Sequence, residues 1–221
     1  AVAEERAEEA ARGKIRGPLH GIPFGVKDII DVMGLPTRCN CKAREDIAPS
    51  TADAEVVLSM KAAGAIVLGK VHNTEFAFRD PSPTRNPHNT DHTPGGSSSG
   101  SSAAVASGTV PVTLGTQTHA SVNRPAAYCG VAAFKPSTRS LSTYGVAPLA
   151  PSFDTIGFYG WSVDDAVYAY EAAAPSSVEF DDLPDAQEEP HIIIIDDPLI
   201  SDADPEMVKA FTTQADRFRA A

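Results

Sequence analysis

The stretch TPGGSSSGSSAAVASG, residues 93–108, decides how the rest of the chain is interpreted. Its glycine and serine content is typical of a flexible linker between two domains. Its second half, residues 101–107, is rich in alanine and predicts a helix, with the serines before it as candidate N-caps. The apolar residues 110–114 follow and predict a strand. The stretch is therefore expected at a loop-to-helix junction inside a compact unit, where a linker would not belong.

The composition favours a soluble globular protein that acts on small molecules. Of 221 residues, 42% are hydrophobic, and 18 basic against 29 acidic residues give a formal net charge of −11. This acidic balance disfavours phosphate contacts, so we expect neither direct nucleic-acid binding nor attachment to an anionic membrane. No run approaches the roughly 18 apolar residues of a spanning helix, and the N-terminal segment lacks the apolar core of a signal peptide. We expect a cytoplasmic protein.

The cysteines agree with a reducing compartment. Cys39, Cys41 and Cys129 are an odd number, which argues against a disulfide framework. The pair Cys39-Asn40-Cys41 could form half of a metal site, but no second pair or spaced histidines complete it, so no metal is expected.

The two ends of the chain predict a fragment. The sequence begins without Met inside a charged helical pattern and stops within an amphipathic helix at residues 207–221. We expect residues 1–221 to belong to a single domain that is incomplete at both ends.

Strands alternate with helices along the chain, which predicts an α/β fold with a mixed sheet core flanked by helices. The expected strands are residues 22–26, 65–68, 110–114, 131–134 and 191–195. The expected helices are the N-terminal segment and residues 53–63, 101–107, 163–173 and 207–221. Turns or loops are expected at residues 33–50, 80–93, 115–120, 135–160 and 176–190, the last as an acidic, solvated connection.

Three polar residues stand at strand ends or tight turns, where α/β folds place reactive side chains. Lys27 follows the first strand, Ser97 lies in the Gly-Gly-Ser turn, and Ser121 follows a later strand. A serine hydroxyl becomes a good nucleophile only when a base takes its proton, and a lysine is such a base only when burial keeps its amine neutral. The alternative for Lys27 is a surface lysine paired with Asp28.

Several motifs, in order, resemble the amidase signature family of serine hydrolases. They are GPLHGIPFGVKD (17–28), AGAIVLGK with TEFA (63–77), TRNPHN (84–89), TPGGSSSGSSAAVASG (93–108), LGTQTHASVNRPAAYCGVAAFKP (114–136) and YGVAPLAPSFDTIG (144–157). The resemblance covers roughly residues 1–175 strongly and the remainder weakly.

This resemblance implies the family fold and a Ser-cisSer-Lys triad. Ser121 is then the nucleophile, Ser97 the serine after a cis peptide bond that relays the proton, and Lys27 the base. The backbone N–H groups of Thr118, His119, Ala120 and Ser121 are the implied oxyanion hole. The implied activity is hydrolysis of a linear amide through an acyl-enzyme, with no metal or organic cofactor. The family is normally more than twice this long, and the missing C-terminal part would form much of the substrate pocket.

Two positions complicate this expectation. The family usually has a Gly-Gly or other small pair before the nucleophile, where this chain has His119 and Ala120. A side chain there would be costly if the turn required positive φ. Arg124 matches the carboxylate-binding arginine of malonamidase-type members, which makes them the expected closest relatives; the alternative is an arginine bound to local carbonyls. Asp154 is expected to organise the loop around the site.

Three functions remain open at this stage. The first is an amidohydrolase for a small, carboxylate-bearing amide, with a homodimer as one expected assembly. The second is the amidotransferase component of a tRNA-dependent complex, which shares these motifs. The third is a catalytically silent structural homologue, against which the joint presence of Lys27, Ser97 and Ser121 speaks.

Overall fold

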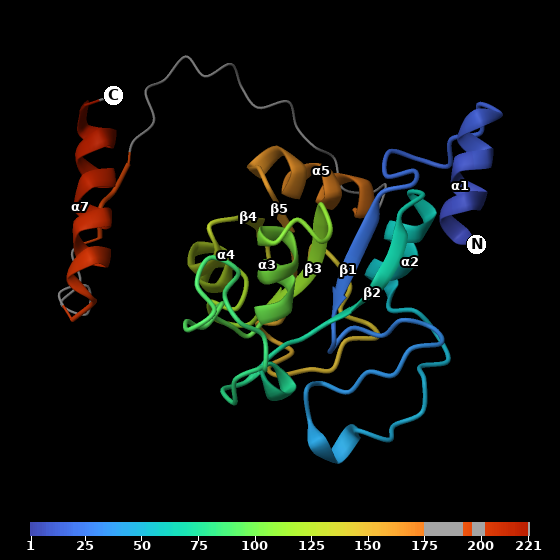
Figure 1. The fold of residues 1–221 in the computed structure, drawn as a ribbon, viewed down its shortest axis with the longest axis horizontal. Coiled ribbons are helices and arrows are strands. Elements are labelled where there is room, and N and C mark those ends of the chain that lie inside the picture. The colour runs from blue at the N-terminus through green and yellow to red at the C-terminus, as the bar shows by residue number, and fades with distance from the viewer. Residues whose placement is uncertain (175–191, 196–201, 221) are drawn as a thin grey trace. The chain divides into compact units, whose positions relative to one another are not determined.

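The computed structural model describes residues 1–174, 192–195 and 202–220. The chain divides into two units, residues 1–178 and 179–221, which are treated separately. The first contains a five-stranded sheet with helices around it, and the described part of the second contains the helix α7 (Pro205–Ala220) (Figure 1). The predicted α/β fold with a mixed sheet is confirmed, while a single domain over 1–221 stays a prediction.

The sheet brings three strand ends to one edge. Its order is β2 (Ile66–Val71), β1 (Pro23–Lys27), β3 (Val112–Gln117), β5 (Thr155–Gly160) and β4 (Ala132–Phe134). β1 pairs in parallel with both β2 and β3, whereas β5 is antiparallel to β3 and β4. The carboxyl ends of β1, β2 and β3 therefore meet at the same edge, which is where open α/β sheets place their sites.

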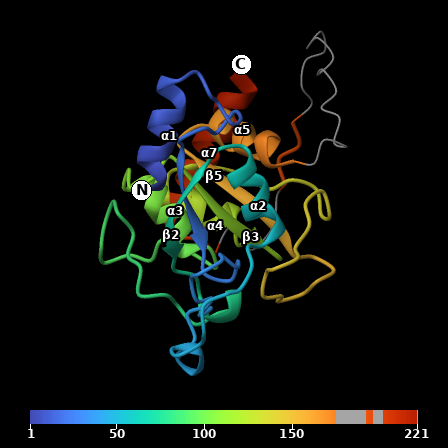
Figure 2. The same ribbon diagram turned by 90° about the vertical axis from the view of Figure 1, so that its right-hand side faces the viewer.

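Helices pack on both faces of the sheet (Figure 2). On one face, α3 (Ser99–Ala106) contacts β1, β2, β3 and β5 and packs against α4 (Asn123–Cys129). α2 (Glu55–Ala62) and α5 (Val163–Ala173) contact each other, and α5 lies on β4 and β5. The remaining elements are α1 (Val2–Ala11) and the short 3₁₀ helices η1 (Lys42–Arg44) and η2 (Glu75–Ala77).

Alternation along the strands separates two cores. Phe24, Val26 and Phe158 belong to the larger buried cluster, which also includes residues of α2 and α5. Tyr159, the next residue of β5, instead packs with residues of α3 and α4 in a smaller cluster. Because successive side chains of a strand point to opposite faces, Lys27 lies on the α3 side, across the sheet from Val26.

Several expected boundaries prove wrong. β3 extends to Gln117, so the turn predicted from Gly115 begins only after that residue. The helix α4 and the strand β5 were not predicted, and β2 extends to Val71. Residues 192–195 form no strand, and His191 and the acidic connection 176–190 lie outside the described residues. The helix at Val163–Ala173 is confirmed, and α7 confirms the C-terminal helix.

Candidate active site

The glycine-serine stretch is a buried turn followed by a helix. Ser97, Ser98 and Ser99 are each at most 1% exposed, which rules out a solvated linker. Gly95 has a φ of +77°, and a Cβ there would lie 2.9 Å from the Cα of Pro125, so the position requires glycine. The Gly96–Ser97 peptide bond is cis, as the resemblance implied.

Lys27 reaches this turn from the end of β1. Its amine is completely buried and donates to Ser97 Oγ at 2.8 Å, to Ser98 Oγ at 3.0 Å and to Thr116 Oγ1 at 2.7 Å. Burial lowers the pKa of this amine from 10.5 to about 7, and the negative charge of Asp154 partly opposes the shift. A lysine with this pKa is neutral in a large fraction of molecules at neutral pH and can accept a proton.

The alternative pairing of Lys27 with Asp28 is wrong. The Asp28 carboxylate forms its ion pair with Lys70 on β2, at 2.9 Å. Within the described residues, the hydrogen-bond partners of the Lys27 amine are hydroxyl and carbonyl oxygens. No carboxylate among these residues is bonded to the amine, so burial outweighs the stabilisation of the ammonium form and its pKa is lowered.

Ser98 occupies the N-cap position of α3, but its side chain does not cap the helix. Its hydroxyl donates to the carbonyl oxygen of Thr116 at 3.1 Å and accepts from Lys27. Ser101, one turn along, donates to the carbonyl oxygen of Leu114 at 2.9 Å. Ser98 and Ser101 thus connect α3 to β3, and Ser98 also holds the amine of Lys27. The sequence alone did not decide between this role and capping of the helix.

Ser121 lies four residues beyond the end of β3 and is 9% exposed. The backbone N–H of Ser98 donates to the Ser121 carbonyl oxygen at 3.3 Å, and the hydroxyl of Tyr159 donates to the same oxygen at 3.2 Å. These bonds bring the Ser121 backbone beside the turn that carries Ser97. The hydrogen bonds within the described residues include the Lys27–Ser97 step but none between the hydroxyls of Ser97 and Ser121.

The turn 118–121 presents unused donors. Within the described part of the chain, the backbone N–H groups of these four residues have no hydrogen-bond acceptor. The turn is fixed from both ends, because Gln117 Oε1 accepts from the N–H of Val122 at 2.7 Å and Thr118 donates to Asp154. Free N–H groups in a fixed turn next to a serine can stabilise a negative oxygen.

His119 and Ala120 do not strain this turn. Neither is among the described residues with positive φ, so a side chain is tolerated at both positions. His119 is exposed. The departure from the usual small pair therefore has no backbone cost here, which removes the physical reason to expect misdirected donors.

Asp154 organises the neighbouring loop, as expected. One carboxylate oxygen accepts from the Thr118 hydroxyl, and the other accepts from the backbone N–H groups of Leu149 and Ala150 at 2.8 and 3.0 Å. The same residue acts electrostatically on Lys27. It therefore links the geometry of the turn to the protonation of the base.

Arg124 is bound to a local carbonyl. Its Nε and Nη2 donate to the Gly96 oxygen at 2.9 and 2.7 Å, so the guanidinium supports the peptide group that precedes Ser97. Of the two roles that the sequence allowed for Arg124, the structure thus shows the bond to a nearby backbone carbonyl. The side chain also lines an open cavity, of which Gly96 forms another part of the wall.

The cysteines lie apart from this chemistry. Burial raises the pKa of the Cys39 thiol to about 11, which makes it a poor ligand or nucleophile at neutral pH. All three cysteines are free. No cluster of three or more His, Cys, Asp or Glu residues suited to a metal occurs in the described ranges. No helix there is long and apolar enough to cross a bilayer.

The comparison of the sequence with family models decides the family. The model described as Amidase matches residues 1–194. The chain belongs to the amidase family. The matched region includes Lys27, Ser97 and Ser121, together with the whole sheet that positions them.

Individual relatives agree. A glutamyl-tRNA(Gln) amidotransferase subunit of Rhodopirellula baltica is 44% identical over 187 residues, which cover 78% of this chain and 37% of the relative. AtzE of Pseudomonas sp., which is a 1-carboxybiuret hydrolase subunit, is 42% identical over 168 residues, 73% of this chain and 37% of the relative. The native peptide amidase of Stenotrophomonas maltophilia has a TM-score of 0.74 and 38% identity, covering 80% of this chain and 38% of that structure.

The chain thus spans less than half the length of these relatives. The expected closeness to malonamidase-type members finds no support among them, because they are a peptide amidase and components of an amidotransferase and of a 1-carboxybiuret hydrolase. That expectation rested on Arg124 as a carboxylate-binding arginine. In the structure the Arg124 guanidinium instead donates to the backbone oxygen of Gly96.

Proposed function

We propose that this chain carries the catalytic relay of an amidohydrolase that cleaves a linear amide bond. The observation that carries the proposal is the fully buried Lys27 amine, with a pKa lowered to about 7, at 2.8 Å from the hydroxyl of Ser97. The family membership and the names of the hydrolase relatives support the same reaction class.

The proposed steps follow from these positions. Ser121 Oγ attacks the amide carbonyl carbon while its proton passes through the Ser97 hydroxyl to the neutral amine of Lys27. The negative oxygen accepts from the free N–H groups of residues 118–121, each worth about 3 kcal/mol. The Lys27 ammonium returns the proton through Ser97 to the leaving nitrogen, and the C–N bond breaks. Water then attacks the acyl-enzyme on Ser121 by the same relay and releases the carboxylic acid.

Ammonia release from small primary amides tests this proposal in the full-length polypeptide. The Ser121→Ala variant should lose activity by at least a thousandfold, whereas Ser107→Ala, an exposed serine at the end of the same stretch, should retain it. Equal rates of ammonia release for the unsubstituted protein and Ser121→Ala would overturn the proposal. No release of ammonia from either protein would leave the silent structural homologue.

The amidotransferase reading is a second candidate, because the relative from Rhodopirellula baltica is named as part of such an enzyme. It would use the same relay to release ammonia from glutamine for a partner. Glutamine hydrolysis that requires added partner proteins, with no turnover of other amides alone, would favour this candidate over the free hydrolase.

The setting of the enzyme is part of the proposal. Three free cysteines and an acidic sequence support a reducing, cytoplasmic location and a small-molecule amide substrate rather than nucleic acid. In this proposal Arg124 contacts substrate only with the N–H groups that its bonds to Gly96 leave unused. We also propose a homodimer as the assembly, which a measurement of the molecular mass of the full-length protein in solution would test.

A further inference from the structure

A cavity of about 490 Å³ lies against the turn that carries Ser97. Its wall includes Gly95, Gly96 and Ser99, which are residues just before and just after Ser97 in the sequence. The cavity therefore lies next to the turn that carries the proton-relay serine. Its lining also includes the segment after η2, with Phe78 and Arg79. Arg124, three residues after Ser121, is also part of the wall.

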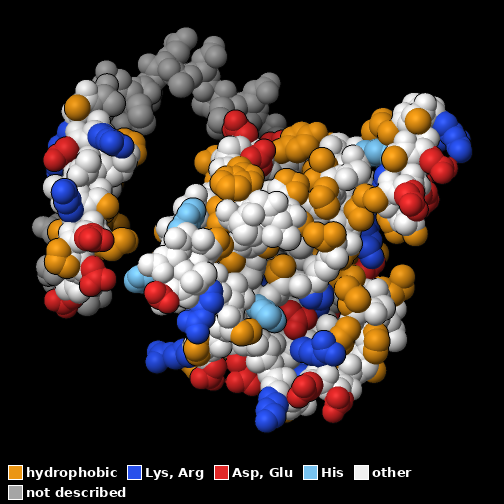
Figure 3. Space-filling model, in the orientation of Figure 1, with side chains coloured by type: hydrophobic (Ala, Val, Ile, Leu, Met, Phe, Trp, Pro, Cys, Tyr) orange, Lys and Arg blue, Asp and Glu red, His pale blue; other side chains and the backbone are white. Residues whose placement is uncertain are grey.

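The cavity is positively charged. Arg79 and Arg124 line it, and no aspartate or glutamate does. Figure 3 shows Lys and Arg side chains at the lower left of the main body, with Asp and Glu side chains beside them. The other polar groups of its lining are mainly hydroxyls, from Thr74, Ser82, Thr93, Ser99 and Tyr128. Two guanidinium groups and several hydroxyls form a donor set suited to a carboxylate.

The two arginines are not equivalent. Arg124 uses Nε and Nη2 on the Gly96 oxygen, which fixes its position and occupies one edge of its guanidinium. Arg79 has no ion pair within the described residues, and its guanidinium lies 5.6 Å from the centre of the Phe78 ring. A cation over an aromatic face is oriented without being neutralised, and within the described part of the chain the five N–H donors of Arg79 have no hydrogen-bond partner.

We propose that this cavity is the subsite for a carboxylate group of the substrate, and that Arg79 is the residue that determines this specificity. The inference rests on the proposed amidohydrolase function and narrows its substrates to amides that also carry a carboxylate. Arg124 holds Gly96 in this scheme and can add only its unused N–H groups, while Arg79 forms the charge-assisted, bidentate contact with the substrate carboxylate.

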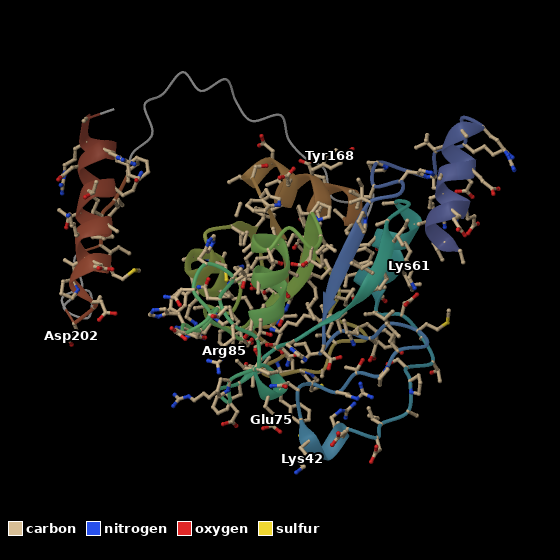
Figure 4. All side chains as sticks on the ribbon, viewed as in Figure 1. Lys42, Lys61, Glu75, Arg85, Tyr168 and Asp202 are labelled. Atoms are coloured by element: carbon tan, nitrogen blue, oxygen red, sulfur yellow. The ribbon has the colours of Figure 1, made fainter. Side chains whose placement is uncertain are left out.

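Binding to the inactive Ser121→Ala protein tests the subsite independently of turnover. The probes are succinamate and its neutral isostere succinamide, measured by calorimetry with the full-length polypeptide. Adding Arg79→Gln should weaken succinamate binding at least tenfold and leave succinamide unchanged, and Arg79→Lys should recover part of the loss. Arg85→Gln is the matched control, an exposed arginine of the same loop that does not line this cavity (Figure 4).

The kinetic counterpart uses the active protein. Arg79→Gln should raise the KM for succinamate with kcat nearly unchanged, because the lost contact is to a part of the substrate that does not react. Equal weakening of both probes, no weakening, or no binding of succinamate would overturn the inference. Arg79-dependent binding in a protein that releases no ammonia would support the subsite and count against the hydrolase, so the two failures are distinguishable.

Discussion

Lys27 Nζ and Ser97 Oγ lie 2.8 Å apart in the interior although 70 residues separate them in the sequence. The contact exists because β1 ends beside the turn before α3, and because the glycines at 95 and 96 allow that turn to approach its neighbours closely. It places an ionisable amine where no solvent reaches it. This burial lowers the pKa of Lys27, which provides a neutral base for catalysis. It also makes the charged form of Lys27 unfavourable for the stability of the fold.

The first prediction concerns stability. The Lys27 pKa is 10.5 when exposed and about 7 in the folded chain, so between these values the unfolded chain binds more protons and the unfolding free energy rises with pH. Lys27→Met removes this dependence. The stability of Lys27→Met relative to the unsubstituted protein should therefore be highest below pH 7 and fall by on the order of 4 kcal/mol by pH 10. Urea denaturation at several pH values measures this difference, and parallel pH profiles for the two proteins would contradict the lowered pKa of the buried Lys27 amine.

A second prediction separates the two roles of Asp154. Its charge raises the pKa of Lys27, so Asp154→Asn should lower that pKa further. The acidic limb of kcat/KM, below which the amine is protonated and inactive, should move to lower pH. Asp165→Asn, in the capping box of α5, is the control and should not move it. A limb that stays in place or moves upward would rule out this coupling.

The third prediction concerns His119. Because His119 and Ala120 have no positive φ, restoring a small residue should not realign the N–H donors. His119→Gly should change kcat/KM by less than about threefold and lower stability by up to about 1 kcal/mol through added freedom of the unfolded chain. Steady-state kinetics on one amide, with a thermal melt, measure both. A gain of tenfold or more in kcat/KM would show that the side chain does misdirect the turn.

The packing behind the base gives a fourth prediction. A Cβ at Gly115 would lie 2.7 Å from Tyr159 Cε2 and 2.9 Å from Ser98 Oγ. Gly115→Ala should thus destabilise the protein by about 1–3 kcal/mol, as overpacking does. Gly69→Ala, also on a strand but with nothing within 4 Å of its Cβ, should change the unfolding free energy by less than about 0.5 kcal/mol. Equal effects of the two substitutions would mean that the close approach at Gly115 is not maintained in solution.

Much of the fold could be predicted from the sequence where its patterns are local. The helix at Val163–Ala173 begins at Ser162 with a reciprocal capping box to Asp165, and it was predicted with correct bounds. α4 was not predicted, although Pro125 is compatible with it, because proline at the third helical position removes only an N–H that has no helical partner anyway. β5 was missed because the glycines and prolines before it suggested turns throughout the region.

The site divides in the same way. Lys27, Ser97 and Ser121 could be selected from motifs, but the partners that tune them are distant in the sequence. Thr116, 89 residues from Lys27, holds its amine, and Asp154 acts on it from the loop before β5. The role of Arg124 was left undecided since a guanidinium suits a substrate carboxylate and a backbone carbonyl equally well. Only the placement of Gly96 decides in favour of the carbonyl.

The central claim is that a neutral Lys27 activates Ser121 through Ser97, and the labelling of Ser121 by phenylmethylsulfonyl fluoride tests it most directly because no natural substrate is needed. Peptide mass mapping should place the label on Ser121, and the labelling rate should rise with pH through a value near 7. Lys27→Met and Ser97→Ala should each slow it at least a hundredfold. Labelling at another residue, or an undiminished rate on Ser121 in Lys27→Met, would contradict the account.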